Sequence, residues 1–488
     1  MRITWSSLLV ATFCLAAVGC TDKGGDDSGS GTDGGGTDGG GTDGGGTDSG
    51  GTDGGTAGDG GVEITDISID LPSTTDECRE VCGTLSVAGT GSLAGVGFQV
   101  ESDLDGFMGV EGVLDAKGQA AFCIPGPLSP GEHQLAFHID ARKGLWGMGS
   151  LTVKPFGWAY GLDKPIEALD APDWVPSFTT EQLQADPVFE WTADTWTSVS
   201  VLAPTTVWFK DQRFLYFAGT PDTTFYLGVA TSTGNTDFVE YAGNPILTSE
   251  ETGAIVGDWD YYAQNTPEAL VVGDELWLYY NGRSEDAGGL NIGLAKSTDG
   301  LHFERIAENP VLGPTGVEGD FDSDGIAHPS VEVRDVDFTD NEADATQVTE
   351  LWYASGTLEI GYAISADGVE FERYCDGSVF AGKGGTWDLG IVKAPEVKHW
   401  NGRYYMTYSG CGQGCYQVGW AVSDDGVRWT QADGPVIPIQ PVGDDGPRWN
   451  SYGTQEAFVE IEDDGLWRFW YAGTGDNHGS VGILELRP

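Results

Sequence analysis

The feature that most constrains the fold is a stretch that recurs five times in the C-terminal part of the chain. Its copies are TWTSVSVLAPTTVWF, DWDYYAQNTPEALVV, DFDSDGIAHPSVEV, TWDLGIVKAPEVKHW and RWNSYGTQEAFVEI. The proline, or its equivalent, stands at positions 204, 267, 329, 395 and 455, so the units are 60 to 66 residues long. A fixed period of this kind indicates one supersecondary unit used repeatedly around a shared core.

Each of the first four units contains the signals of four strands. An aromatic strand such as ELWLYYNG follows the proline, and a third strand such as NIGLAKS comes next. In three units the third strand ends in S-x-D-G, where Asp-Gly suits a tight turn, and a short fourth strand follows. Four strands in five units predict a five-bladed β-propeller over residues 186–488. The fifth unit stops after its third strand, and we expect the segment Pro187–Trp191 to supply the missing edge.

Residues 63–155 predict a second, smaller all-β domain. Short alternating runs such as GTLSVAGT and HQLAFHID, separated by Gly, Pro and Asp, are typical of an antiparallel sandwich. The ending PGEHQLAFHIDARKGLWGMGSLTV resembles the last strands of bacterial immunoglobulin-like modules. We therefore expect an all-β chain, with an Ig-like sandwich followed by a connector (156–185) and the propeller.

The N-terminus has the pattern of an export signal. Residues 1–19 combine Arg2, an apolar run and small residues, and the AVGC that ends at Cys20 resembles the bacterial lipobox. That resemblance implies a lipidated Cys20 and a lipoprotein in the bacterial cell envelope, at the outer membrane or cell surface. A plain signal peptide with a chance cysteine is the alternative. Residues 20–62, almost wholly Gly, Asp, Thr and Ser, predict a disordered tether.

The charge restricts the partners. With 76 acidic and 23 basic residues, the formal net charge is −53. A surface this acidic repels nucleic acid and anionic lipid headgroups, so we expect no nucleic-acid partner and membrane contact only through the anchor. We expect a monomer.

Six cysteines remain after Cys14 and Cys20. In an exported protein they favour disulfides, and we predict Cys82–Cys123 and Cys411–Cys415. The sequence does not decide the state of the other two, Cys78 and Cys375. A zinc site at the C-x₃-C spacing is the rival interpretation.

The repeated motifs x-P-x-V, YY-x-G, S-x-D-G-x-x-F/W and NPVL resemble those of the five-bladed glycoside hydrolases of the arabinanase, xylosidase, invertase and levansucrase group. The resemblance covers roughly 300 residues and implies carboxylates at the tunnel mouth. The arabinanase-like enzymes carry these acids just before the blade-start proline. This chain has Ala203, His328 and Lys393 at the matching positions, so the usual acids are absent.

Other carboxylates stand near the blade starts and leave two alternatives open. In the first, a relocated acid–base pair catalyses hydrolysis, and in the second these groups are structural or bind ligand. The candidate catalytic residues are Asp260, Asp324, Asp388 and Glu396. The candidate substrate contacts are His328, Lys393, Glu268, Glu456, Trp387, Trp449 and Tyr452, with Trp259 and Tyr262 as further aromatic candidates. We expect Glu268, Glu396 and Glu456 to share one orientation, because each follows the proline position.

Asp320, Asp322 and Asp324 match the D-x-D-x-D-G start of a calcium loop. The twelfth position, where such a loop needs an acid, is Val331. We therefore expect no required cofactor, with calcium at these three aspartates as the open alternative.

Two functions from different classes follow from the resemblance. The chain is either a surface-anchored glycoside hydrolase with relocated carboxylates or a non-catalytic glycan-binding or cell-surface interaction module. Carbohydrate is the expected ligand in the first and in the glycan-binding form of the second. The sequence leaves open whether the protein is an enzyme, which sugar it takes and which linkage it recognises.

Overall fold

A computed structural model describes most of the chain beyond the tether. The described residues are 63–139, 146–154, 156, 174–222, 224–284, 289–335, 347–375, 377–383, 387–412, 415–442, 448–475 and 478–488. They contain two four-residue helices, α2 (Thr180–Leu183) and α3 (Ser249–Thr252), and are otherwise strands and loops, which confirms the all-β prediction. No helix in this part of the chain is long and apolar enough to span a membrane. The predicted signal, Cys20 and the tether lie outside the described residues.

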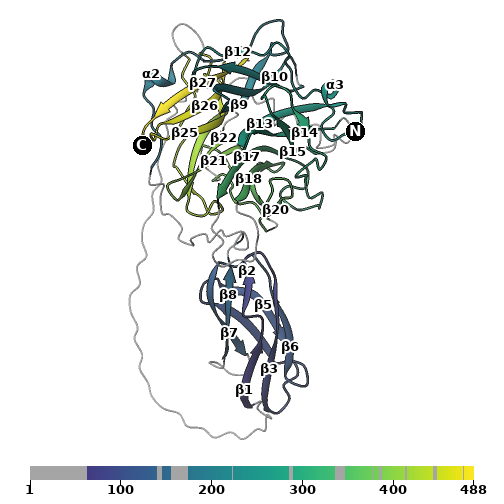
Figure 1. Cartoon of the computed structure of the whole chain (residues 1–488). Helices are drawn as coiled ribbons and strands as arrows, with labels where there is room; N and C mark the ends of the chain where they lie inside the picture. The colour runs from purple at the N-terminus through teal and green to yellow at the C-terminus, as the bar shows by residue number, and fades with distance from the viewer. Residues whose placement is uncertain are drawn as a thin grey trace, which may run out of the picture.

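Residues 63–154 form two sheets packed face to face (Figure 1). One sheet has the order β1 (Glu63–Asp70), β3 (Val81–Thr90), β6 (Gln119–Ile124). The other has the order β2 (Thr74–Asp76), β8 (Trp146–Lys154), β7 (Gly131–Ile139), β4 (Gly97–Ser102), β5 (Gly106–Val113). Alternate side chains of both sheets, among them Leu85, Val100 and Leu135, are fully buried between them. The alternation of apolar and polar residues along each strand thus places the apolar side chains in the sandwich core.

The repeats form five groups of antiparallel strands. Their first strands are β9 (Ser200–Phe209), β13 (Ala263–Val272), β17 (Ile326–Asp335), β21 (Val392–Trp400) and β25 (Gly453–Ile461). The second strands are β10 (Gln212–Thr220), β14 (Glu275–Arg283), β18 (Gln347–Ser355), β22 (Arg403–Gly412) and β26 (Trp467–Gly475). The third strands are β11 (Tyr226–Ser232), β15 (Asn291–Ser297), β19 (Ile360–Ser365), β23 (Cys415–Ser423) and β27 (His478–Leu486). Short fourth strands close the first four groups, namely β12 (Val239–Glu240), β16 (Glu304–Arg305), β20 (Glu372–Arg373) and β24 (Thr430–Gln431).

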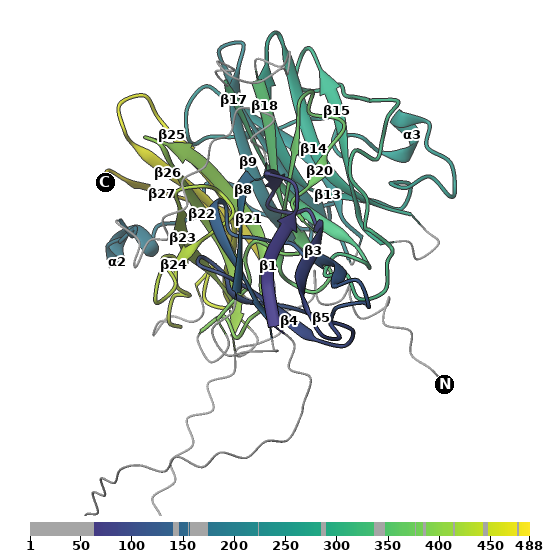
Figure 2. The ribbon, with the colours of Figure 1, turned by 90° about the horizontal axis from the view of Figure 1, so that it is seen from below.

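The first strands surround a common axis. Each contacts the first strand of the next group, from β9 to β13, β17, β21 and β25 and back to β9. This cycle is the geometry of a propeller, with each group of strands as one blade. In the view from below, Figure 2 shows the sandwich strands β1, β3, β4 and β5 in front of the propeller. One parallel pair, Ser200 with Gly479, joins the first and last blades into a single seven-stranded sheet.

The segment before the first blade completes the last one. Phe189 pairs antiparallel with Val481 of β27, and the amide of Val481 donates to the carbonyl of Phe189 at 2.8 Å. Trp191 stacks on His478 with ring centroids 3.7 Å apart. The N-terminal segment therefore covers the edge that the fifth unit leaves without a fourth strand, at the place expected from the sequence.

Successive blades are tied through the S-x-D-G turns. Tyr279 Oη donates to the carbonyl of Gly368 in the next blade at 2.7 Å, and Tyr216 does the same to Gly300. Trp352 Nε1 donates to Gly426 at 2.7 Å. The aromatic second strands thus bind the turn of the following blade, which explains why aromatics and S-x-D-G recur together.

A disulfide, an ion pair and an aromatic contact join the sandwich to the propeller. Cys78 forms a disulfide with Cys375, which follows β20. Next to it, the Glu77 carboxylate accepts from Arg428 at 2.9 Å, and Phe156 packs edge-on against Tyr374. Arg428 follows an S-x-D-G turn, at the end of the blade opposite to the starts of the first strands. The sandwich therefore lies at the end of the propeller that is opposite to the starts of the first strands.

The other cysteines give one confirmation and one correction. Cys82 and Cys123 lie directly opposite each other on β3 and β6 and form the predicted disulfide. The prediction of a Cys411–Cys415 disulfide is wrong, since Cys411 is a buried thiol. Cys415 pairs with Gly412 in the hairpin, so Cys411 and Cys415 are out of register by one and their side chains lie on opposite faces of the sheet.

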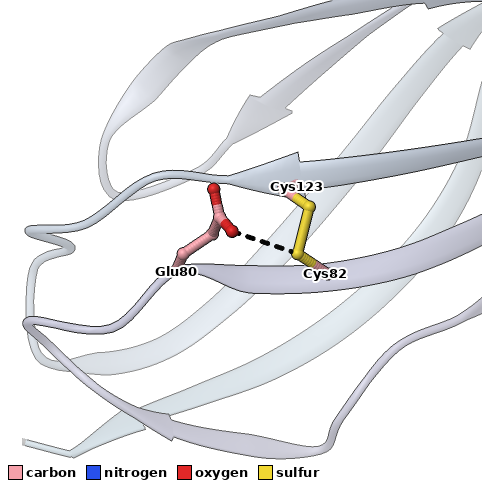
Figure 3. Close-up of side chains that lie close together, drawn as sticks. All are labelled: Glu80, Cys82 and Cys123. Atoms are coloured by element: carbon pink, nitrogen blue, oxygen red, sulfur yellow. Dashed lines mark hydrogen bonds between the residues drawn. A yellow bond between two sulfur atoms is a disulfide. The ribbon is translucent and has the colours of Figure 1, made fainter.

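The zinc interpretation of the C-x₃-C spacing also fails. Cys78 and Cys82 belong to two different disulfides, so neither thiolate is available. Figure 3 shows Glu80 beside the Cys82–Cys123 bridge, with Glu80 Oε1 at 3.3 Å from Cys82 Sγ. This trio has the spacing of a metal site, but oxidised sulfurs are poor ligands for a metal ion.

Candidate functional site: the mouth of the propeller channel

Every first strand carries a β-bulge at the same place. The pairing with the second strand slips between Ala327 and Ser330 of β17, for example, and equivalent slips occur in the other four blades. The bulged residues have positive φ, from 43° to 53°, and all carry side chains: Ala203, Thr266, His328, Ala394 and Glu456. Bulges of this kind re-aim side chains, and here they form a ring around the axis.

This ring corrects one alignment drawn from the sequence. Glu456 is equivalent to His328 and Ala394, not to Glu268 and Glu396, because the proline equivalent of the fifth blade is Ala457 and not Gln455. The side chain of Glu456 therefore does not share the orientation of the other two glutamates. The fifth stretch has no proline, so nothing in its sequence marks its register.

A cavity opens at the mouth of the channel above this ring. The space that the centre of a water-sized sphere can occupy in it is about 40 Å³, and the cavity continues into open solvent. It lies among the first three blades and Glu456 of the fifth. Its lining residues are mainly apolar with a few polar groups: Leu202, Ala203, Ala218, Phe225, Tyr262, Ala263, Asn265, Thr266, Asn281, Arg283, Leu290, Ala327, His328 and Glu456. Apolar walls with a few polar groups are typical of small-ligand sites.

A buried ion pair lies at the floor of the cavity. Lys393 Nζ is 3.0 Å from Glu456 Oε1, and the two side chains are 1% and 7% exposed. Glu456 Oε2 also accepts from the Ala203 amide at 3.0 Å. One carboxylate oxygen is thus paired with a cation, and the other is fixed by a backbone donor.

His328 lies beside this pair and is uncharged. Burial lowers the pKa of His328 well below its usual range, and the positive charge of Lys393 lowers it further. Its amide donates to Thr266 Oγ1 at 3.3 Å. At neutral pH the imidazole therefore brings no charge to the cavity.

The rim of the cavity on the second blade is formed by a tyrosine, an arginine and two amides. Arg283 lies over the ring of Tyr262, with Cζ 5.1 Å from the ring centroid. Below them, Asn281 Nδ2 donates to Asn265 Oδ1. Asn281 is 1% exposed, and its side-chain oxygen has no hydrogen-bond partner among the residues that the structure describes. This acceptor is available to a ligand hydroxyl.

Further along the axis, beyond the prolines that follow the bulged residues, Lys398 lies close to three glutamates. Its Nζ lies 2.9 Å from Glu396, 3.0 Å from Glu332 and 3.9 Å from Glu268. Burial raises the pKa of Glu396 to about 7, and burial together with the charge of Glu396 raises the pKa of Glu268. Glu268 and Glu396 line the axial passage but not the mouth cavity. Two of the candidate acids are therefore separated from the mouth by the bulge ring.

The aspartates of the Trp-Asp and Phe-Asp pairs hold their own blades together. Asp260 accepts from Tyr280 Oη at 2.7 Å and from Arg305 at 2.5 Å. Asp322 accepts from Tyr353 and Arg373, both at 2.9 Å. Asp388 accepts from Gln431 at 2.5 Å. Each carboxylate thus joins the loop before the first strand to the fourth strand of the same blade, and none of the three lines the mouth cavity.

The tryptophans of these pairs fill a groove in the same blades. Trp259 occupies the space where side chains on Gly282 and Gly293 would stand, and Trp449 does so at Gly473 and Gly482. Trp387 lies in the same way against Gly410. Trp387, Trp449 and the half-buried Tyr452 are not among the residues that line the mouth cavity, whereas Tyr262 is.

Asp324 and the other aspartates of the predicted calcium loop are not among the residues that line the cavity. Asp324 is exposed, and Asp322 is bound by Arg373 as described. The carboxylates of Asp320, Asp322 and Asp324 do not form a metal-sized group in the described structure. A calcium ion there would compete with Arg373 for Asp322, and calcium binding stays a prediction.

Sequence reasoning missed Arg283, Asn281 and Asn265. All three stand near the starts or ends of strands, in QNTP and YYNGR, where the blade motifs draw attention to aromatics and prolines. Their position in the repeat could have indicated them. The end of a second strand lies at the same mouth as the start of a first strand, because the two strands are antiparallel.

Comparison with known proteins yields solved structures only. No family model matches the sequence, and no curated protein matches it. A glycosyl hydrolase from Bacteroides ovatus shares 16% identity over 65% of this chain and 96% of its own, with a TM-score of 0.48. A second structure belongs to work on the GH130 family of mannoside phosphorylases, which contains glycoside hydrolases that target β-1,2 mannosidic linkages in Candida mannan. It shares 16% sequence identity over 65% of this chain and 96% of its own, with a TM-score of 0.49. A thermostable family-43 glycoside hydrolase shares 18% over 61% and 93%, with a TM-score of 0.42.

These neighbours are glycoside hydrolases, the group that the blade-start motifs indicate. At such identities and scores they carry no argument about function, and the propeller assignment rests on the strand pairing of the chain itself.

Proposed function

We propose that this protein binds a carbohydrate in the cavity at the propeller mouth and does not hydrolyse it. The polar groups of the cavity suit sugar hydroxyls, because Asn281 offers an acceptor beside the uncharged His328. The face of Tyr262, which is 39% exposed, offers an apolar surface for a sugar ring. The motif resemblance to glycoside hydrolases supports the same ligand class.

The observation that carries the absence of hydrolysis is the Lys393–Glu456 ion pair. Glycosidases of this general type need one carboxyl group that gives up a proton and a second that acts as base or nucleophile. Glu456 is the only carboxylate among the described residues that line the mouth cavity, and its two oxygens are already bound by Lys393 and by the Ala203 amide. Among these lining residues no second carboxylate faces it across the cavity, so the pair of acids that hydrolysis needs is absent there.

The test is a screen of the full chain against aryl glycosides and polysaccharides, with binding measured in parallel by calorimetry. We expect binding without turnover, weakened by Asn281→Ala and unchanged by the exposed control Asp324→Asn. Hydrolysis that Glu396→Gln abolishes would overturn the proposal and establish the alternative of a relocated acid. Failure of every sugar to bind would refute the carbohydrate ligand itself.

We also propose that Cys20 is lipidated and that residues 21–62 tether the protein to the cell envelope. The AVGC at 17–20 and the apolar-free Gly/Asp/Thr repeat support this arrangement. Labelling with a radioactive fatty acid should mark the wild type and not Cys20→Ser. Equal labelling of both would refute it.

A further inference from the structure

Arg283 is fixed at the mouth of the cavity by the sheet itself. It is the last residue of β14 and pairs with Ala263 of β13, and its carbonyl accepts from the Tyr262 amide at 2.9 Å. The guanidinium stacks on Tyr262 and lines the cavity. Because the pairing with β13 and the Tyr262 amide hold its backbone, the charge is presented to the cavity from a rigid element.

Arg283 differs from the comparable arginines of the propeller. Arg305, Arg334 and Arg373 are partly buried, and each makes an ion pair of 2.9 Å or less with a carboxylate. Arg283 forms no ion pair with a carboxylate in the described part of the chain, although the protein has 76 acidic residues. An unpaired guanidinium at a half-buried site is a binding group for an anion.

The other ionisable groups of the cavity do not cancel this charge. Glu456 is already paired with Lys393, and His328 is neutral. Counting the described residues, the cavity with its floor therefore carries one uncompensated positive charge, that of Arg283, in a protein whose net charge is −53. A positive cavity on so acidic a surface indicates selection for the charge of the ligand rather than general attraction of anions.

We propose that the sugar bound at this mouth carries a carboxylate, as in a hexuronic acid, and that Arg283 binds that carboxylate. The inference rests on the proposed carbohydrate function and specifies its ligand. The planar fork of the guanidinium matches the two oxygens of a carboxylate. The ring then lies toward Tyr262, with a hydroxyl donating to the unpartnered oxygen of Asn281.

The experiment compares matched ligands by calorimetry on the full chain. The probes are the methyl glycosides of glucuronic and galacturonic acid, their methyl esters, the neutral hexosides and a sulfated hexoside. The variants are Arg283→Gln, Arg283→Lys and the control Lys117→Gln, which removes the same charge from an exposed site of the sandwich. We expect at least one uronide to bind roughly tenfold or more tighter than its ester. Arg283→Gln should abolish this preference, Arg283→Lys should keep part of it and Lys117→Gln all of it.

Each other outcome has a distinct meaning. Equal binding of uronide, ester and neutral hexoside would overturn the inference and leave the proposed function standing. Preference for the sulfated sugar alone would overturn the assignment of a carboxylate. A uronide preference that survives Arg283→Gln would remove Arg283 from the site. Absence of binding by every sugar would overturn both the inference and the proposed function.

Discussion

Nζ of Lys393 and Oε1 of Glu456 lie 3.0 Å apart at the floor of the propeller mouth, on neighbouring blades. The two residues are 63 positions apart in the chain, about one repeat unit. The lysine stands where the resemblance to the glycoside hydrolases calls for an acid, and the glutamate stands on a bulge that no motif marks. The carboxylate at the centre of the site is therefore paired with a lysine.

We predict that replacing one member of this ion pair destabilises the protein more than replacing both. Lys393→Met alone leaves Glu456 buried without its cation, and we expect the free energy of unfolding to fall by about 3–5 kcal/mol. The double variant Lys393→Met/Glu456→Gln should recover most of this loss. Urea unfolding of the two single variants and the double variant measures the coupling, and strictly additive losses would contradict it.

The Trp-Asp aspartates should matter for stability and not for binding. Asp260→Ala leaves the partly buried Arg305 and Tyr280 without their acceptor, so we expect a loss of about 2–4 kcal/mol. The matched control Asp324→Ala, at an exposed site, should change the free energy of unfolding by less than about 0.5 kcal/mol. Thermal melts together with sugar titrations separate the two roles. A loss of binding by folded Asp260→Ala would show that this carboxylate belongs to the site.

Stability should fall as pH rises from about 4.5 to 7. Burial raises the pKa of Glu396 to about 7, so in this range the folded protein holds a proton that the unfolded chain releases. The folded state therefore binds more protons, and the free energy of unfolding decreases with increasing pH. Glu268, whose pKa burial also raises, acts in the same direction. Urea midpoints at several pH values should show a shallower decline for Glu396→Gln, and an unchanged slope would contradict the assignment.

The Cys78–Cys375 disulfide should hold the sandwich against the propeller. In Cys78→Ser/Cys375→Ser we expect the attachment of the sandwich to weaken by about 2–4 kcal/mol, because the cross-link closes a loop of 297 residues. The Glu77–Arg428 pair and Phe156 alone would then hold the two together. Small-angle scattering should show a larger radius of gyration, with sugar affinity unchanged. A scattering curve identical to that of the wild type would mean that the noncovalent contacts suffice.

The sequence by itself determined the repeating architecture. The recurring prolines, aromatic strands and S-x-D-G turns each indicate local structure, namely a strand, a turn or a glycine beside a tryptophan. Local structure depends mainly on residues that are close in the sequence, so a sequence pattern can predict it. The same reasoning placed the edge strand near Phe189 and the Cys82–Cys123 bridge, because both follow from counting strands and from alternation along them.

Only the tertiary structure decided the site. The bulge that turns Glu456 toward the axis is a matter of register, and a shift of one residue changes which face a side chain takes. The same one-residue offset separates Cys411 from Cys415. Lys393 with Glu456, and Cys78 with Cys375, come together from distant parts of the chain, and no local pattern records such a meeting. Charges act through space, so which carboxylate is neutralised and which arginine stays unpaired is settled only when the blades close around the axis.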